Sequence, residues 1–192
     1  MKSRQKLNKS IMKKTIILTI CAVINVASYA VDYKVENESV VFSKVIENTG
    51  KSVQQAHDIL EAYFATAYND VNSTEKLNKE DHLIYKGLFI NVCTYLMGMW
   101  RIDVPHTVDV AIKENRVRIM ITVTDAVNKS EKGGSVSYNI ATCHPVNPDA
   151  KATVCLKKDA ETAFNNTAIR IDELIREIEK QLMREVAPSE DW

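Results

Sequence analysis

The sequence lacks the patterns by which most enzymes and metalloproteins are recognised. It contains no Gly-x-Ser-x-Gly motif of a nucleophilic serine, and Gly133-Gly134 does not fit a phosphate-binding loop. No two of its histidines are four residues apart, and no two cysteines have the close spacing of a zinc site. We therefore expect no cofactor, no metal site and no assignable catalytic residue.

Acidic residues are absent from residues 1–30, and so is an apolar run long enough to span a membrane. Basic residues precede an apolar run over residues 15–24, which is followed by small residues at Ser28 and Ala30. These are the three parts of a signal peptide, and a run of about ten apolar residues is half the length of a membrane span. We expect a cleavable signal peptide over 1–30, followed by a single domain over 31–192 without a transmembrane anchor. The protein is then exported, and is either periplasmic or secreted.

An excess of positive charge is also missing. The chain has 25 basic and 25 acidic residues, and removal of the six basic residues of the signal peptide leaves 19 against 25, a net charge near −6. Nucleic acids and anionic lipid surfaces attract basic proteins. We therefore expect no nucleic acid as the main partner.

Three cysteines follow the signal peptide. Cys143 and Cys155 bracket a segment with two prolines, which predicts a loop. In an oxidising compartment we expect them to form a disulfide that contributes about 3 kcal/mol in the chain-entropy view, the alternative being two thiols. Cys93 lies in an apolar stretch, where we expect a buried and unreactive side chain.

Hydrophobic periodicity predicts two helices. Ser52 is a plausible N-cap for a helix over about 53–68, whose apolar residues recur every three or four positions. A second helix is expected from a cap at Asp159 to about residue 186, with an apolar stripe that includes Ile171, Ile175 and Ile178.

The strands are predicted by β-branched content and by alternation. We expect strands over 40–46, 74–77 and 82–93, with Gly87 as a candidate bulge. Residues 107–113 and 116–124 alternate strictly around Glu114-Asn115, which predicts an antiparallel hairpin. The stretch 94–104 is left unassigned, and 128–158 is expected to be an irregular excursion with a short strand near 135–140. The order of these predicted strands and helices indicates an α+β fold in which two helices cover one face of an antiparallel sheet.

The outward side of the hairpin is the candidate binding surface. Arg116, Arg118, Met120 and Thr122 alternate with its apolar residues and so point away from the helices. A surface rich in Arg and Thr with a central Met is a plausible docking site; an ordinary solvated face is the alternative.

The order of the predicted elements and several short segments of the sequence resemble those of an exported bacterial family known as domain of unknown function 4468. The similarity covers about residues 39–127 and includes 41–46, 50–52, 84–87 and the charged hairpin 112–119. The resemblance implies a fold similar to one repeat of the TATA-binding protein, a curved antiparallel sheet with helices on one face. It implies no catalytic residue, and fold alone does not give function.

Three functions stay open at this point. The favoured one is a non-enzymatic module that binds another envelope protein, a peptide or another envelope component. The second is a small hydrolase that uses Cys93 or His144. The third is a carrier of an apolar small ligand, suggested by the apolar stretch 88–100.

Overall fold

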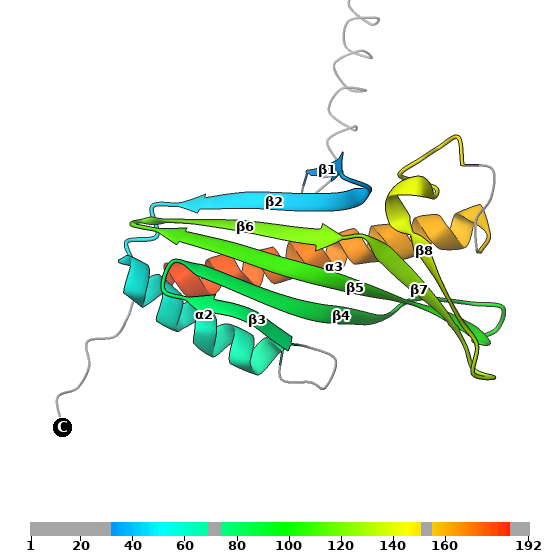
Figure 1. Ribbon diagram of the computed structural model, residues 1–192, viewed down its shortest axis with the longest axis horizontal. Helices are drawn as coiled ribbons and strands as arrows, with labels where there is room; N and C mark the ends of the chain where they lie inside the picture. Colours follow the sequence, from blue (N-terminus) through cyan, green and yellow to red (C-terminus); the bar gives the residue numbers. More distant parts are fainter. Residues whose placement is uncertain (1–31, 69–73, 151–154, 185–192) are drawn as a thin grey trace, which may run out of the picture. The chain divides into compact units, whose positions relative to one another are not determined.

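The computed structural model describes residues 32–68, 74–150 and 155–184. The predicted signal peptide, residues 1–30, lies outside them. The described residues form an antiparallel sheet and two long helices, as Figure 1 shows. The elements are β1 (Tyr33–Glu36), β2 (Ser39–Glu47), α2 (Val53–Ala67), β3 (Thr74–Lys79), β4 (His82–Tyr95), β5 (Trp100–Lys113), β6 (Arg116–Val123), β7 (Asp125–Ser130), β8 (Ser135–Asn139), the 3-10 turn η1 (Ile140–Thr142) and α3 (Lys157–Met183).

The strands form one sheet in the order β1-β2-β6-β5-β4-β3, and β7 and β8 continue from β5 off this path. Strand β5 changes partner along its length on one side. Its residues 100–103 pair with β7, and its residues 107–113 pair with β6. Pro105 falls between these two segments. Its missing N–H therefore costs no hydrogen bond to β6 or β7, which explains how a proline is accommodated inside a long central strand.

Both helices lie on the same face of the sheet (Figure 1). Phe64 of α2 stacks on Tyr85 of β4 with ring centroids 4.5 Å apart, and Phe164 of α3 lies 6.5 Å from Phe42 of β2. Lys44 of β2 donates to Glu179 of α3 at 2.6 Å. The core is the dry layer between helices and sheet, so the expected α+β architecture is confirmed. No helix in the described part of the chain is long and apolar enough to cross a membrane.

Helix α2 begins where the sequence predicts. The Ser52 side chain accepts a hydrogen bond from the Gln55 backbone N–H at 3.2 Å, and the Gln55 side chain accepts one from the Ser52 backbone N–H at 3.0 Å. This reciprocal capping box satisfies two N–H groups that the first turn leaves without helical partners.

Helix α3 begins two residues before the predicted cap. Its N-cap is Leu156, which makes no side-chain capping bond, and Asp159 lies in the first turn. A carboxylate in the first turn still interacts favourably with the positive end of the helix dipole. The predicted apolar stripe is buried as expected, with Ile171, Ile175 and Ile178 inaccessible to solvent.

The β5–β6 hairpin confirms the clearest sequence pattern. Asn115 has φ of 60°, the left-handed conformation that a tight turn requires. Its side-chain oxygen also accepts a hydrogen bond from the Gly50 backbone N–H at 2.7 Å, which ties the hairpin to the loop before α2.

Three assignments along the middle of the chain were wrong or incomplete. The unassigned stretch 94–104 belongs to a second hairpin, because β4 continues to Tyr95 and β5 starts at Trp100. The irregularity in β4 lies between Phe89 and Cys93 and not at Gly87. The excursion after residue 127 is more regular than expected, since β7 and β8 pair as a hairpin before the chain turns through η1.

Gly87 is required by packing across the sheet. It lies opposite His106 in the register, and a Cβ on residue 87 would lie 2.4 Å from Tyr68 Cε1 and 2.7 Å from His106 Nε2. Any side chain would displace both rings. The glycine therefore makes room for a buried histidine and does not mark a bulge.

Candidate functional site

The face of the sheet opposite the helices is built from alternate residues of β2, β6, β5 and β4. On β6, Val117, Ile119 and Ile121 are buried against the helices, and the residues between them point the other way. Arg116 and Arg118 are exposed, and Met120 and Thr122 are half-buried. The structure thus places the four predicted residues on one surface, which we call the open face.

The register extends the open face across the sheet. Arg118 lies beside Val45 on β2 and beside Ala111 on β5. Met120 lies between Ser43 and Asp109, whose own neighbour on β4 is Ile84. Apolar and charged side chains are therefore interspersed along these rows, as in many protein-binding surfaces.

A hollow of about 300 Å³ lies at the hairpin end of this face. Val45 and Ala111 supply its apolar part, and Lys113, Arg116 and Arg118 surround them. Three cations around a small apolar patch suit a ligand that carries negative charge next to an apolar group.

A second hollow, of about 340 Å³, lies further along the same strands. Its polar lining includes Lys76, Lys86, Thr107, Thr122 and Asp125. Thr122 comes from the predicted set, and the lysines come from β3 and β4. The open face therefore has a depression near each end of the predicted row of residues.

Most cationic side chains on the open face are not neutralised by a strong ion pair with an acidic side chain of the same protein. The Arg116 guanidinium lies 3.9 Å from Glu47, but both side chains are at least half exposed, so the pair is weak. Asp109 is engaged by His82 at 3.1 Å. Within the described ranges, Lys113 and Arg118 form no ion pair. Their charges are available to a ligand.

The expected disulfide is absent from the structure. Cys143 and Cys155 are present as thiols, and both are buried. Burial, with the nearby Asp159 carboxylate, raises the pKa of Cys155 to about 11. Two cysteines that bracket a loop lie near each other in sequence, but a bridge also needs their Cβ bonds to point together. Here both thiols are buried and no bridge joins them.

Cys93 and His144, the two residues of the hydrolase alternative, have these surroundings in the structure. Burial raises the pKa of Cys93, so little of it is thiolate near neutral pH, and its thiol donates to the Thr94 backbone oxygen. His144 Nε2 lies 3.9 Å from the Glu161 carboxylate. The stretch proposed to hold an apolar ligand is a β-hairpin, and its tip residue Met97 is almost fully exposed.

Comparison with known proteins confirms the fold. No protein-family model and no curated protein matches the sequence. The structure is similar to that of a TBP-like protein from Parabacteroides distasonis ATCC 8503, with a TM-score of 0.65 and 16% identity over 80% of this chain and 98% of that one. It is also similar to a DUF4468 family protein from Bacteroides ovatus ATCC 8483, with a TM-score of 0.60 and 14% identity over 82% and 94%.

These similarities establish the architecture expected from the sequence resemblance, an α+β domain of the TBP-like type. At such low identity they carry the fold alone.

The part of the open face that comes from strands outside the hairpin was not predicted from the sequence. Val45 and Lys86 reach the two hollows only through the pairing of β2 and β4 with the hairpin strands. Their alternation places each on a face of its own strand. Alternation does not show which strands are neighbours. The pairing of neighbouring strands is what brings these residues to the same face as Arg116 and Arg118.

Proposed function

We propose that this protein is an exported binding module, periplasmic or secreted, whose open face engages an acidic segment of another envelope protein or peptide. The observation that carries the proposal is the group of three cations, Lys113, Arg116 and Arg118, around the apolar floor of the hairpin-end hollow. An acidic segment with apolar side chains complements both features.

The distribution of charge supports this partner. Without its signal peptide the chain has a net charge near −6, yet the hollow is lined by cations alone among its charged residues. A basic patch on an otherwise acidic molecule steers an acidic partner to one face. The same net charge disfavours a nucleic acid, whose binding uses many cations at once.

Charge reversal at the hollow tests the proposal. The variant Arg116→Glu/Arg118→Glu is expected to bind a labelled peptide of alternating Glu and Leu at least tenfold more weakly than wild type, a loss of about 1.4 kcal/mol or more. Fluorescence anisotropy measures the affinity. Binding by wild type is also expected to weaken as salt rises, because exposed charges are screened.

The matched control is Lys157→Glu/Lys158→Glu, which makes the same change in net charge at exposed positions of α3. It is expected to bind the peptide as tightly as wild type does. Equal weakening in both double variants would show that only net charge matters and would contradict a site at the hairpin.

Export has its own test. The form of the protein recovered from the cell envelope or medium is expected to begin at Val31, because the predicted cleavage follows Ala30. Intact-mass measurement reads this directly. An envelope form that starts at the original methionine would contradict the predicted processing.

A further inference from the structure

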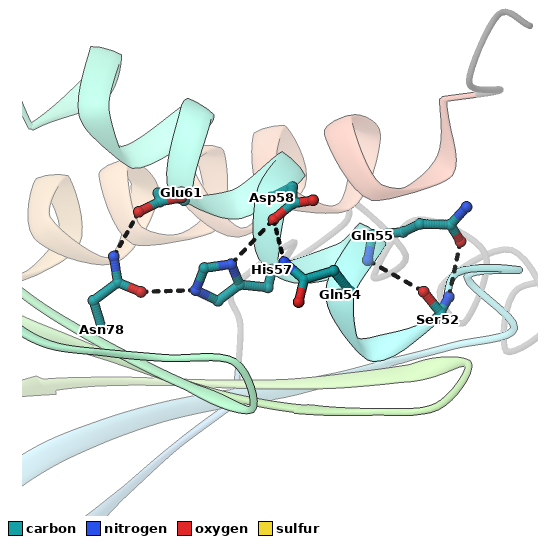
Figure 2. A network of polar contacts seen from close by, with 7 residues as sticks. All are labelled: Ser52, Gln54, Gln55, His57, Asp58, Glu61 and Asn78. Carbon is teal, nitrogen blue, oxygen red and sulfur yellow. Dashed lines mark hydrogen bonds and ion pairs between the residues drawn. The ribbon is translucent and has the colours of Figure 1, made fainter. Parts of the chain in front are cut away.

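A second polar cluster lies between helix α2 and strand β3, on the helix-covered side of the sheet (Figure 2). The His57 ring is largely buried, and its Nε2 lies 2.7 Å from Asn78 Oδ1. The Asn78 amide nitrogen donates to Glu61 Oε1 at 2.6 Å. Since the amide group is turned toward Glu61, its oxygen faces the ring. His57 Nε2 therefore carries a hydrogen and donates it to Asn78.

The other ring nitrogen faces a carboxylate. His57 Nδ1 lies 3.4 Å from Asp58 Oδ1, an oxygen that Gln54 Nε2 also holds at 2.6 Å (Figure 2). With the hydrogen on Nε2, a neutral imidazole presents a lone pair at Nδ1. Two acceptors that face each other repel unless a cation is shared between them. The geometry thus calls for a positive charge beside Nδ1.

We propose that His57, Asp58 and Glu61 bind a divalent transition-metal ion of the zinc type. One donor atom from each residue lies within 4.8 Å of the other two. Ligands of a tetrahedral zinc ion lie about 2.0–2.2 Å from the metal and so about 3.4 Å from one another, and the donor atoms therefore have to approach by up to about 1.4 Å. His57 is fixed by burial, whereas Asp58 is exposed and Glu61 half-buried, and their side chains are able to close on the ion.

The surrounding contacts match those of a metal-bound histidine. Such a ring usually donates its second N–H to a carbonyl or carboxylate oxygen, which fixes the tautomer and the ring orientation. Asn78 Oδ1 supplies that acceptor, and its amide group orients Glu61 as well. An imidazole ligand favours zinc and related ions over magnesium or calcium, which prefer oxygen ligands alone. A water molecule would complete the coordination.

The spacings of the histidines and of the cysteines predicted no metal site, because neither pairs a histidine with a carboxylate. The spacing that matters joins His57 to Glu61, one helical turn apart, and the supporting asparagine comes from a different element. This inference is independent of the binding function proposed for the open face.

Calorimetric titration of the purified protein with zinc chloride at about pH 7.5 tests the site. Wild type is expected to bind one zinc ion per chain, and magnesium is expected not to compete. Glu61→Gln is expected to weaken zinc binding at least tenfold, because glutamine still accepts from Asn78 but has no charge. The control His82→Gln, which alters the His82–Asp109 pair on the open face, is expected to bind zinc like wild type.

A second readout follows the ring itself. Zinc is expected to shift the ¹⁵N resonance of His57 Nδ1 in wild type and to leave the resonances of His106 unchanged. If that resonance responds to pH but not to zinc, the positive charge beside Nδ1 is a proton and the proposal is wrong. Unchanged zinc affinity in Glu61→Gln would also overturn it.

Discussion

Lowering the pH from 7 to 4 is expected to remove about 3 kcal/mol from the free energy of unfolding through His106 alone. The ring is 5% exposed and stacks on Phe89 with centroids 3.9 Å apart. Tyr68 Oη donates to its Nε2 at 2.8 Å, a contact suited to the neutral imidazole. Burial lowers the pKa of His106 from 6.5 to about 4, against a weak opposing hydrogen bond to the Val104 oxygen.

The sign of the effect follows from which state binds the proton. In the unfolded chain His106 takes up a proton below about pH 6.5, whereas the folded protein resists protonation until about pH 4. The stability that depends on neutral His106 is therefore complete above pH 6.5 and is lost as the pH falls toward 4. Each pH unit in that window costs about 1.4 kcal/mol, which gives the total of about 3.

Urea unfolding followed by circular dichroism at several pH values measures this loss. Because carboxyl groups also titrate in this range, the quantity to compare is the difference between wild type and His106→Gln. The variant is expected to lose about 3 kcal/mol less than wild type between pH 7 and pH 4. A control, Ile178→Ala, removes a buried side chain from α3 and is expected to lower stability by a similar amount at every pH. Parallel curves for wild type and His106→Gln would contradict the assignment.

Truncation of Phe64 is expected to destabilise the protein by about 3–5 kcal/mol. The ring is inaccessible to solvent and is the centre of an aromatic cluster at the contact of α2 with the sheet. It stacks on Tyr85 at 4.5 Å and meets Tyr63 and Tyr68 edge-on at 5.3 and 5.5 Å. The alanine variant loses the buried area and leaves a cavity that the stiff sheet is unable to fill.

Ile169→Ala is the control for this measurement, because Ile169 is 55% exposed on α3. Its truncation is expected to change the free energy of unfolding by less than about 0.5 kcal/mol. Denaturant unfolding of both variants at neutral pH gives the comparison. A similar small effect for Phe64→Ala would mean that α2 does not seal this face of the sheet, and the distinction between a covered face and an open one would fail.

The elements that the sequence predicted well are those whose signals are local. Strict alternation around Asn115 determined the β5–β6 hairpin, and Ser52 with the apolar stripe after it determined the start of α2. Arg116 and Arg118 were placed correctly on the open face for the same reason, because alternation alone decides the side of a strand to which they belong.

The first half of β5 was not predicted, because its inward-facing residues are not all apolar and its outward-facing residues are not all exposed. His106 occupies an inward position, and Asp103 is buried on the opposite side. Asp103 is held there by Lys129 of β7 at 2.8 Å and by the Asn91 backbone N–H at 2.7 Å. The carboxylate can be buried because other strands bring these partners to it. A local sequence pattern does not contain that tertiary pairing.

Cys143 and Cys155 show the same limit in a different form. Their spacing and the prolines between them suit a bridged loop, yet Cys155 lies against Tyr138, whose pKa burial raises. Which neighbours a thiol meets depends on how β8 and η1 return the chain to the core. An oxidising compartment favours a bridge, but the bridge also requires a side-chain geometry that the spacing of two cysteines does not specify.

The most direct test of the central claim, that ligand binding uses the open face, is a titration followed by amide chemical shifts. Adding the acidic Glu-Leu peptide to ¹⁵N-labelled protein is expected to shift the amides of residues 111–118 and of Val45, while the amides of α3 stay in place. Shifts confined to the helices, or none at a peptide concentration that saturates the anisotropy signal, would contradict the claim.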